Sequence, residues 1–87
     1  MTVKRLPAVD LSEMAIELAI GQLAGSVGPI TLVASTALAD EAKHMCMGMN
    51  LTLAIVPAEM LSEPLAWAVV VGRDVCWCDG NFDMPVA

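Results

Sequence analysis

Two apolar segments of strand length flank a helical segment in the middle of the chain, and this spacing constrains the fold more than any other feature. Residues 30–34 and 51–56 are short, rich in apolar side chains and bounded by residues that break regular structure. Between them lies an amphipathic segment that Ser35 or Thr36 can cap and that Gly48 can end. A strand, a helix and a strand connected in this way predict a parallel β-α-β unit with a right-handed crossover.

A further helix is predicted over residues 11–24. Asp10 and Glu13 have the spacing of a capping box at its start, and Gly25 follows its end. On a helical wheel the acidic residues form a narrow stripe, and nearly all of the remaining circumference is apolar. A helix on the surface of a lone domain needs a wider polar face. We therefore expect this helix to be buried on two sides, with another subunit as a candidate cover for the second side.

The C-terminal third of the chain predicts an antiparallel hairpin. Residues 66–71 and 75–78 are apolar strands around Gly72 and Arg73, and glycine at the first position of a two-residue loop is typical of a tight hairpin turn. Residues opposite each other across such a ladder share a face. The predicted faces are Trp67, Val69, Cys76 and Cys78 on one side and Ala68, Val70, Val75 and Trp77 on the other.

Together these elements predict an α/β fold, in the form of a small two-layer domain. We expect a mixed sheet of about four strands, in which the parallel β-α-β core and the C-terminal antiparallel hairpin are packed by two helices. The 87 residues leave room for a single core. Residues 1–87 therefore form one domain, with a short N-terminal arm at residues 1–9 and a C-terminal tail at residues 79–87.

The chain holds more apolar sequence than a domain of this length buries. Hydrophobic residues make up 57% of it and charged residues 16%, whereas a small domain buries only about 60–65% of the surface of its unfolded chain. A membrane, an apolar pocket or a partner subunit must take up the surplus. Charged residues interrupt every apolar run before the roughly 18 residues that a membrane helix needs. We therefore expect no membrane and a homo-oligomer or larger protein assembly.

Charge and cysteine content exclude further classes of protein. The net charge of −6 argues against direct binding of nucleic acid or of an anionic lipid surface. The N-terminus lacks the uninterrupted apolar stretch of a secretory signal. Three cysteines are an odd number, and their spacing is not that of a disulfide framework. These observations predict a cytoplasmic protein with free thiols.

No motif in the chain specifies a reaction or a cofactor, so we expect neither. The leading hypothesis is a small acidic non-enzymatic protein-interaction or assembly subunit that self-associates through apolar helix and sheet surfaces. The predicted interface residues are apolar side chains of the first helix, the hairpin and the tail: Leu11, Met14, Ile16, Leu18, Ile20, Trp67, Trp77, Phe82 and Met84.

Two alternatives stay open. Cys76 and Cys78, on one face of a strand, can supply two corners of a tetrahedral metal site or a thiol redox pair. The other soft ligands, Cys46 and His44, point to nearly opposite sides of their helix, and the competing interpretation is that the thiols fill core space. The second alternative is an inhibitor that docks on a basic partner protein, although the acidic residues are scattered rather than dense.

Overall fold

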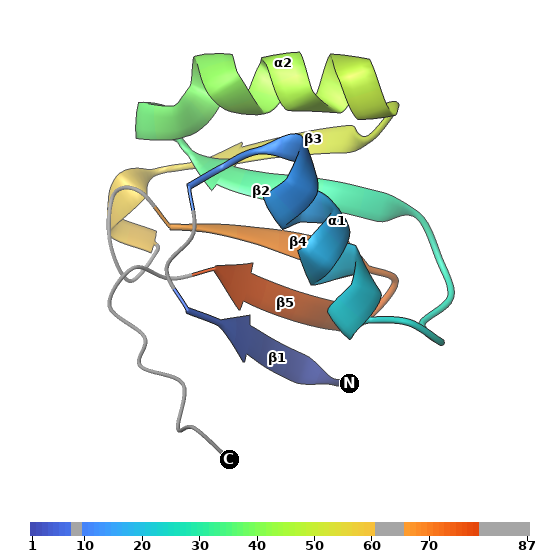
Figure 1. The fold of residues 1–87 in the computed structure, drawn as a ribbon. Helices are drawn as coiled ribbons and strands as arrows, with labels where there is room; N and C mark the ends of the chain where they lie inside the picture. The colour runs from blue at the N-terminus through green and yellow to red at the C-terminus, as the bar shows by residue number, and fades with distance from the viewer. Residues whose placement is uncertain (8–9, 61–65, 79–87) are drawn as a thin grey trace.

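A five-stranded mixed sheet carries the fold in the computed structural model, which describes residues 1–7, 10–60 and 66–78. The strand order is β1-β5-β4-β2-β3 (Figure 1). Along the chain the elements are β1 (Val3–Leu6), α1 (Glu13–Gln22), β2 (Ile30–Ser35), the 3-10 helix η1 (Thr36–Leu38), α2 (Ala39–Met49), β3 (Thr52–Val56), the 3-10 helix η2 (Ala58–Met60), β4 (Trp67–Val71) and β5 (Asp74–Cys78).

The predicted α/β class, with two helices packed on a mixed sheet, is confirmed. The sheet has five strands rather than about four, because the N-terminal segment forms β1 and pairs in parallel with β5. The predicted β-α-β unit is also present, since β2 and β3 are parallel neighbours joined by α2. The two parallel pairs, β1 with β5 and β2 with β3, therefore join strands that are separated in the sequence.

The predicted C-terminal hairpin is present with the predicted faces. Gly72 has a φ angle of +60° at the first turn position, a conformation that glycine adopts without steric cost. Trp67 lies opposite Cys78, and Ala68 lies opposite Trp77. The antiparallel register between β4 and β5 therefore separates the two tryptophans onto opposite faces of the sheet.

Both long helices have ends that differ from the prediction. The N-cap of α1 is Ser12, whose Oγ accepts a hydrogen bond from the backbone N–H of Ala15 at 3.2 Å; Asp10 lies two residues further from the first helical turn. The second helix runs through Gly48 to Met49, and its C-cap is Asn50, which has a left-handed φ of 57°. Asparagine tolerates this conformation better than most residues, and it therefore serves as the C-cap in place of glycine.

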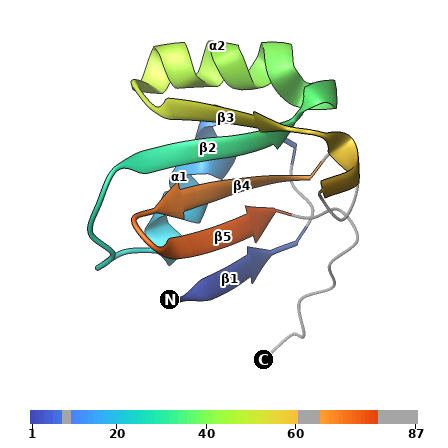
Figure 2. The same ribbon diagram turned by 180° about the vertical axis from the view of Figure 1, so that it is seen from behind.

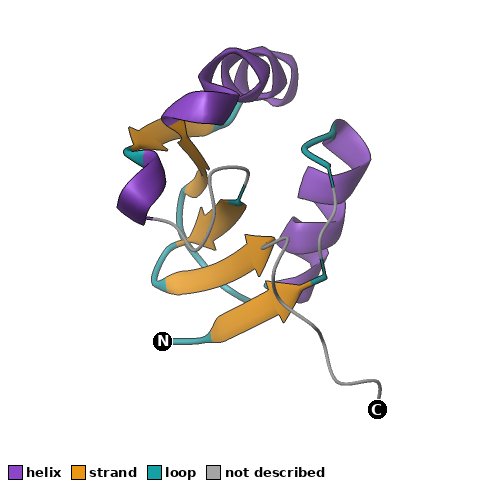
Figure 3. Ribbon diagram, turned by 90° about the vertical axis from the view of Figure 1, so that its left-hand side faces the viewer, coloured by secondary structure: helices purple, strands orange, loops and turns teal. Residues whose placement is uncertain are grey.

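The two long helices lie on the same face of the sheet (Figure 3). α1 connects β1 to β2 and α2 connects β2 to β3, so both parallel crossovers advance across the sheet in the same direction. Such connections are almost always right-handed, and two right-handed crossovers that advance in one direction place their helices on one face. The topology therefore covers one face of the sheet and leaves the other without α1 or α2.

One hydrophobic core fills the space between the helices and the covered face. Ile16 and Ala19 of α1 and Ala42 and Cys46 of α2 pack against strand side chains. Burial of each large aliphatic side chain contributes about 1.5–3 kcal/mol. The strand residues of this core alternate along each strand: Leu6, Leu32, Ala34, Trp67, Val69, Val71, Cys76 and Cys78.

The residues described include no helix with the length and apolar character that crossing a membrane requires.

Candidate interaction surface

The sheet face opposite α1 and α2 is the most unusual surface of the molecule. Figure 2 looks onto this side of the sheet, with α1 behind the strands. Successive residues of a strand point to opposite faces, and the pairing registers align the outward residues of all five strands into rows. We call this surface the open face; its strand residues are Val3, Arg5, Thr31, Val33, Ser35, Thr52, Ala54, Val56, Ala68, Val70, Val75 and Trp77.

The open face is apolar and almost uncharged. Eight of its twelve residues are apolar, three carry hydroxyl groups and only Arg5 is charged. Seven of these side chains are half-buried and three are exposed, whereas Ser35 and Ala68 have no exposed surface. A sheet with one solvated face usually alternates apolar residues inward with polar residues outward. The apolar surplus expected from the sequence therefore lies, at least in part, on this face.

The central row of the open face combines one large side chain with small neighbours. Across the strands this row reads Arg5, Trp77, Ala68, Val33 and Ala54. Tryptophan is enriched among the residues that contribute most to protein interfaces. On the same row Ala54 of β3 is half-buried, whereas Ala68, next to Trp77, has no exposed surface, so Trp77 is the one large side chain that this row offers to a partner.

Several predicted interface residues lie where a partner could reach them. Trp77 is half-buried on the open face, and Met14 and Leu18 are exposed on α1. Leu11 and Ile20 are partly buried and pack against the core. The helix is thus covered on one side by the sheet, and its other side is exposed rather than buried. Phe82 and Met84 lie outside the described residues.

Two predicted interface residues are placed in the core instead. Ile16 and Trp67 have no exposed surface, because Ile16 faces the sheet from α1 and Trp67 lies on the covered face of β4. The prediction of an interface role for these two residues is therefore wrong for the folded domain. Conversely, Val33, Ala54 and Val56 were not predicted; their alternation with core residues along β2 and β3 is the signal that could have identified them.

Cys76 and Cys78 lie in the core. Burial raises the pKa of Cys78 to about 12, with a smaller contribution from neighbouring Cys76. Burial also raises the pKa of Cys76, against a lowering by the positive charge of Lys4. The thiolate is the nucleophile and the metal ligand, so these environments oppose the thiol-based alternative. Among the residues described, no three His, Cys, Asp or Glu side chains are placed to hold a metal ion together.

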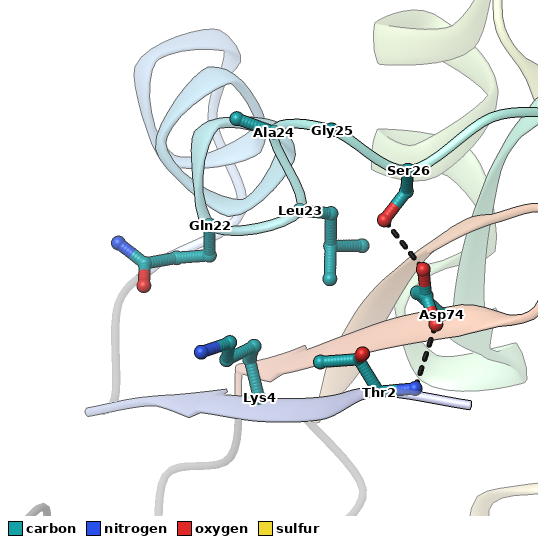
Figure 4. A pocket seen from close by; sticks show the side chains of 8 residues that line it. All are labelled: Thr2, Lys4, Gln22, Leu23, Ala24, Gly25, Ser26 and Asp74. Carbon is teal, nitrogen blue, oxygen red and sulfur yellow. Dashed lines mark hydrogen bonds between the residues drawn. The ribbon is translucent and has the colours of Figure 1, made fainter.

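Asp74 at the start of β5 joins three segments of the chain (Figure 4). Its Oδ2 accepts a hydrogen bond from the Ser26 hydroxyl at 2.5 Å, and its Oδ1 accepts one from the backbone N–H of Thr2 at 2.6 Å. These hydrogen bonds, that of Ser26 first, lower the pKa of the Asp74 carboxyl. Lys4 and Gln22 line the adjacent pocket of about 410 Å³. Because both carboxylate oxygens already accept hydrogen bonds, we interpret Asp74 as a structural link between β1, β5 and the α1–β2 loop.

Comparison with protein-family models, with curated proteins and with solved structures found no match. Function therefore has to be inferred from the physical character of the surfaces themselves.

Proposed function

We propose that this chain is a small acidic, non-enzymatic assembly subunit that self-associates through the open face. The single observation that carries the proposal is the apolar character of that face, which α1 and α2 leave uncovered. Contiguous apolar patches on a domain surface mark sites of protein association. The face is built on strands rather than loops, so it is rigid and presents its side chains without a large loss of conformational entropy on binding.

The distribution of charge favours a second copy as the partner. Copies with a net charge of −6 repel one another over their surfaces as a whole. The open face has no acidic strand residue, whereas Glu13 and Glu17 lie on α1 and Asp40 and Glu41 on α2. Two copies that pack face to face therefore keep these four carboxylates on the outer sides of the assembly. Sheets packed in this way are about 10 Å apart, with side chains of both faces interdigitating.

The size of the open face sets the expected strength of the contact. Five strands about 4.8 Å apart and roughly five residues at about 3.3 Å each give a face of about 400 Å² per copy. A typical stable complex buries roughly 800 Å² per partner. The face contact alone therefore predicts a weak, concentration-dependent association rather than an obligate dimer.

Sedimentation velocity over a series of protein concentrations tests the proposal. We expect the weight-average mass to rise with concentration for the wild type. Val70→Lys places a charge on the central strand of the open face and should remove the association made through this face, so that its weight-average mass over the same range stays below that of the wild type. Val27→Lys is the matched control, because Val27 is 89% exposed in the α1–β2 loop and does not belong to the open face. A wild type that stays monomeric, or a Val70→Lys variant that associates like the control, contradicts the proposal.

We place this function in the cytoplasm. Cys46, Cys76 and Cys78 are all free thiols in the structure, and free thiols are the usual state of cysteine in a reducing compartment. Acid quenching of the cells, followed by alkylation in denaturant, tests this location. Complete alkylation of the three thiols without prior reduction supports a reducing location, and thiols that react only after reduction contradict it.

A further inference from the structure

The outer edge of β3 is a second exposed surface, distinct from the open face. β3 ends the sheet, and among the described residues its only strand partner is β2. The segment Thr52–Val56 has no charged residue, glycine or proline. Edge strands are usually protected from pairing with other chains by such residues. The opposite edge, β1, is protected in this way by Lys4 and Arg5, so the two edges of the sheet differ in their readiness to pair.

On the helical side, the β3 edge carries a hollow next to a projecting side chain. The hollow has a volume of about 380 Å³ and lies between the edge and α2. Leu53 lines it, and Met47, 84% exposed, lies at its border. Ile55 follows Leu53 on the same face of the strand and is 36% exposed. The full lining of the hollow is Lys43, Cys46, Met47, Asn50, Leu51 and Leu53.

We propose that β3 pairs antiparallel with β3 of a second copy, about a two-fold axis that passes through Ala54. In this register Ala54 lies opposite the partner's Ala54, and Leu53 lies opposite the partner's Ile55. Residues opposite each other in an antiparallel ladder share a face of the sheet. Each copy therefore places its Ile55 beside Leu53 of the other, at the mouth of the other's hollow, and the two five-stranded sheets become one.

The identity of the occupant follows from the match between these features. Ile55 and the hollow lined by Leu53 lie two residues apart on the β3 edge. A two-fold axis between them places the Ile55 side chain of each copy at the hollow of the other copy. The edge itself is uncharged, so two acidic copies meet there without direct repulsion. Lys43, at the rim, reaches solvent with its ammonium group while its aliphatic stem covers apolar surface.

The area of the open face gives a further reason for a second contact. That face supplies about half of the surface that a typical stable complex buries per partner, and edge pairing adds strand, hollow and helix surface to it. Both contacts are two-fold, and they occupy different sides of the domain, so one copy can make both and the assembly can close as a tetramer. The edge contact uses its own surface and stands even if association through the open face is disproved.

Disulfide crosslinking tests the register directly. In the proposed pairing the two Ala54 Cα atoms are about 4.5–5.5 Å apart, within the range of roughly 4.4–6.8 Å for a disulfide. Ala54→Cys should therefore give a reducible dimer when the folded protein is treated with oxidised glutathione. Thr52→Cys, on the same strand face, is the matched control, because the two Thr52 positions would be about 13 Å apart. The wild type shows whether the native thiols contribute.

Crosslinking at least tenfold faster for Ala54→Cys than for Thr52→Cys supports the proposal. Equal rates for the two variants, or no dimer with Ala54→Cys, overturn it. A second comparison uses double variants. Ile55→Lys combined with Ala54→Cys should slow crosslinking at least tenfold. Val27→Lys combined with Ala54→Cys should not, because Val27 lies in the α1–β2 loop, on neither the open face nor the β3 edge; equal rates for these two also overturn the proposal. Val70→Lys combined with Ala54→Cys separates the two surfaces, because it should abolish the face contact and keep the crosslink.

Discussion

Trp67 and Trp77 lie on opposite faces of the sheet. Trp67 lies opposite Cys78 in the β4–β5 ladder and shares its face, whereas Trp77 precedes Cys78 in β5 and therefore points to the other face. Trp67 is fully buried in the core, and Trp77 is half-buried on the open face. Trp67 therefore stabilises the folded domain, whereas in our proposal Trp77 contributes to self-association.

This division predicts different effects for the two tryptophan variants. Trp67→Ala should lower the free energy of unfolding by about 3–5 kcal/mol, because it leaves a large cavity in the core. Trp77→Ala should lower it less and should instead raise the dissociation constant for self-association. Urea denaturation of dilute protein measures the first quantity, and sedimentation measures the second. Equal losses of stability in both variants, with association unchanged, would contradict the division.

The link through Asp74 predicts a pH-dependent contribution to stability. The pKa of the carboxyl is lowered in the folded state from its ordinary value of 3.8 by hydrogen bonds from Ser26 and Thr2. A carboxyl with a lowered folded pKa stabilises the protein above its ordinary pKa, and this contribution is lost as the pH falls through the folded pKa. Asp74→Asn should therefore destabilise the protein at neutral pH, with the difference from wild type shrinking below pH 3.8.

Urea denaturation of both proteins from neutral pH to below pH 3.8 measures this difference. Asp40→Asn controls for the change in net charge, because Asp40 is exposed on α2 and does not line the pocket beside Asp74. Ser26→Ala should reproduce part of the Asp74→Asn effect, since it removes one of the two donors. A constant difference between Asp74→Asn and wild type across the whole pH range would show that the linkage is absent.

The elements that local sequence determines were predictable, and the arrangement across the sheet was not. The hairpin faces follow from Gly72 and from strand alternation, and the parallel pairing of β2 and β3 follows from the length of the connection between them. The strand order depends on β1, which joins the sheet beside β5 rather than beside β2. Only this long-range pairing makes both crossovers advance in one direction, and no local pattern encodes it.

The same limit explains the errors in the predicted interface. Ile16 and Trp67 were predicted to lie in the interface because nearly all of the circumference of the first helix and both strands of the hairpin are apolar. Which side of α1 faces the sheet, and which face of β4 is covered, depend on the placement of α1 over β4 and β5. The sequence predicted more apolar side chains than the core can bury. Only the topology shows that many of the remaining ones lie on the open face, on β2, β3, β4 and β5.

The buried thiols predict slow reaction with alkylating reagents. A pKa of about 12 for Cys78, against an ordinary value of 9.0, lowers its thiolate fraction at neutral pH about a thousandfold. Iodoacetamide should therefore label Cys78 at least a hundredfold more slowly in the folded protein than in denaturant. Mass spectrometry of peptides after timed labelling measures the rate at each cysteine. Rapid labelling of Cys78 in the folded state would restore the thiol-based alternative.

Two glycine substitutions should change stability in opposite directions. Gly72 has a φ of +60°, and a Cβ there would lie 2.2 Å from the carbonyl oxygen of Val27. The left-handed conformation alone costs an ordinary residue about 1–3 kcal/mol, and the contact with backbone adds to this, so Gly72→Ala should destabilise the domain by at least that amount. Gly48 lies within α2, where a Cβ would meet nothing within 4 Å.

Gly48→Ala should therefore stabilise the protein by about 0.5–1 kcal/mol, because alanine loses less backbone entropy in a helix than glycine does. The pair is matched in the atoms added and differs only in the backbone around them. Thermal and urea denaturation of both variants beside the wild type measures the two changes. Were Gly72→Ala as stable as the wild type, the turn could not have both the left-handed backbone and the close approach to Val27 that the structure shows.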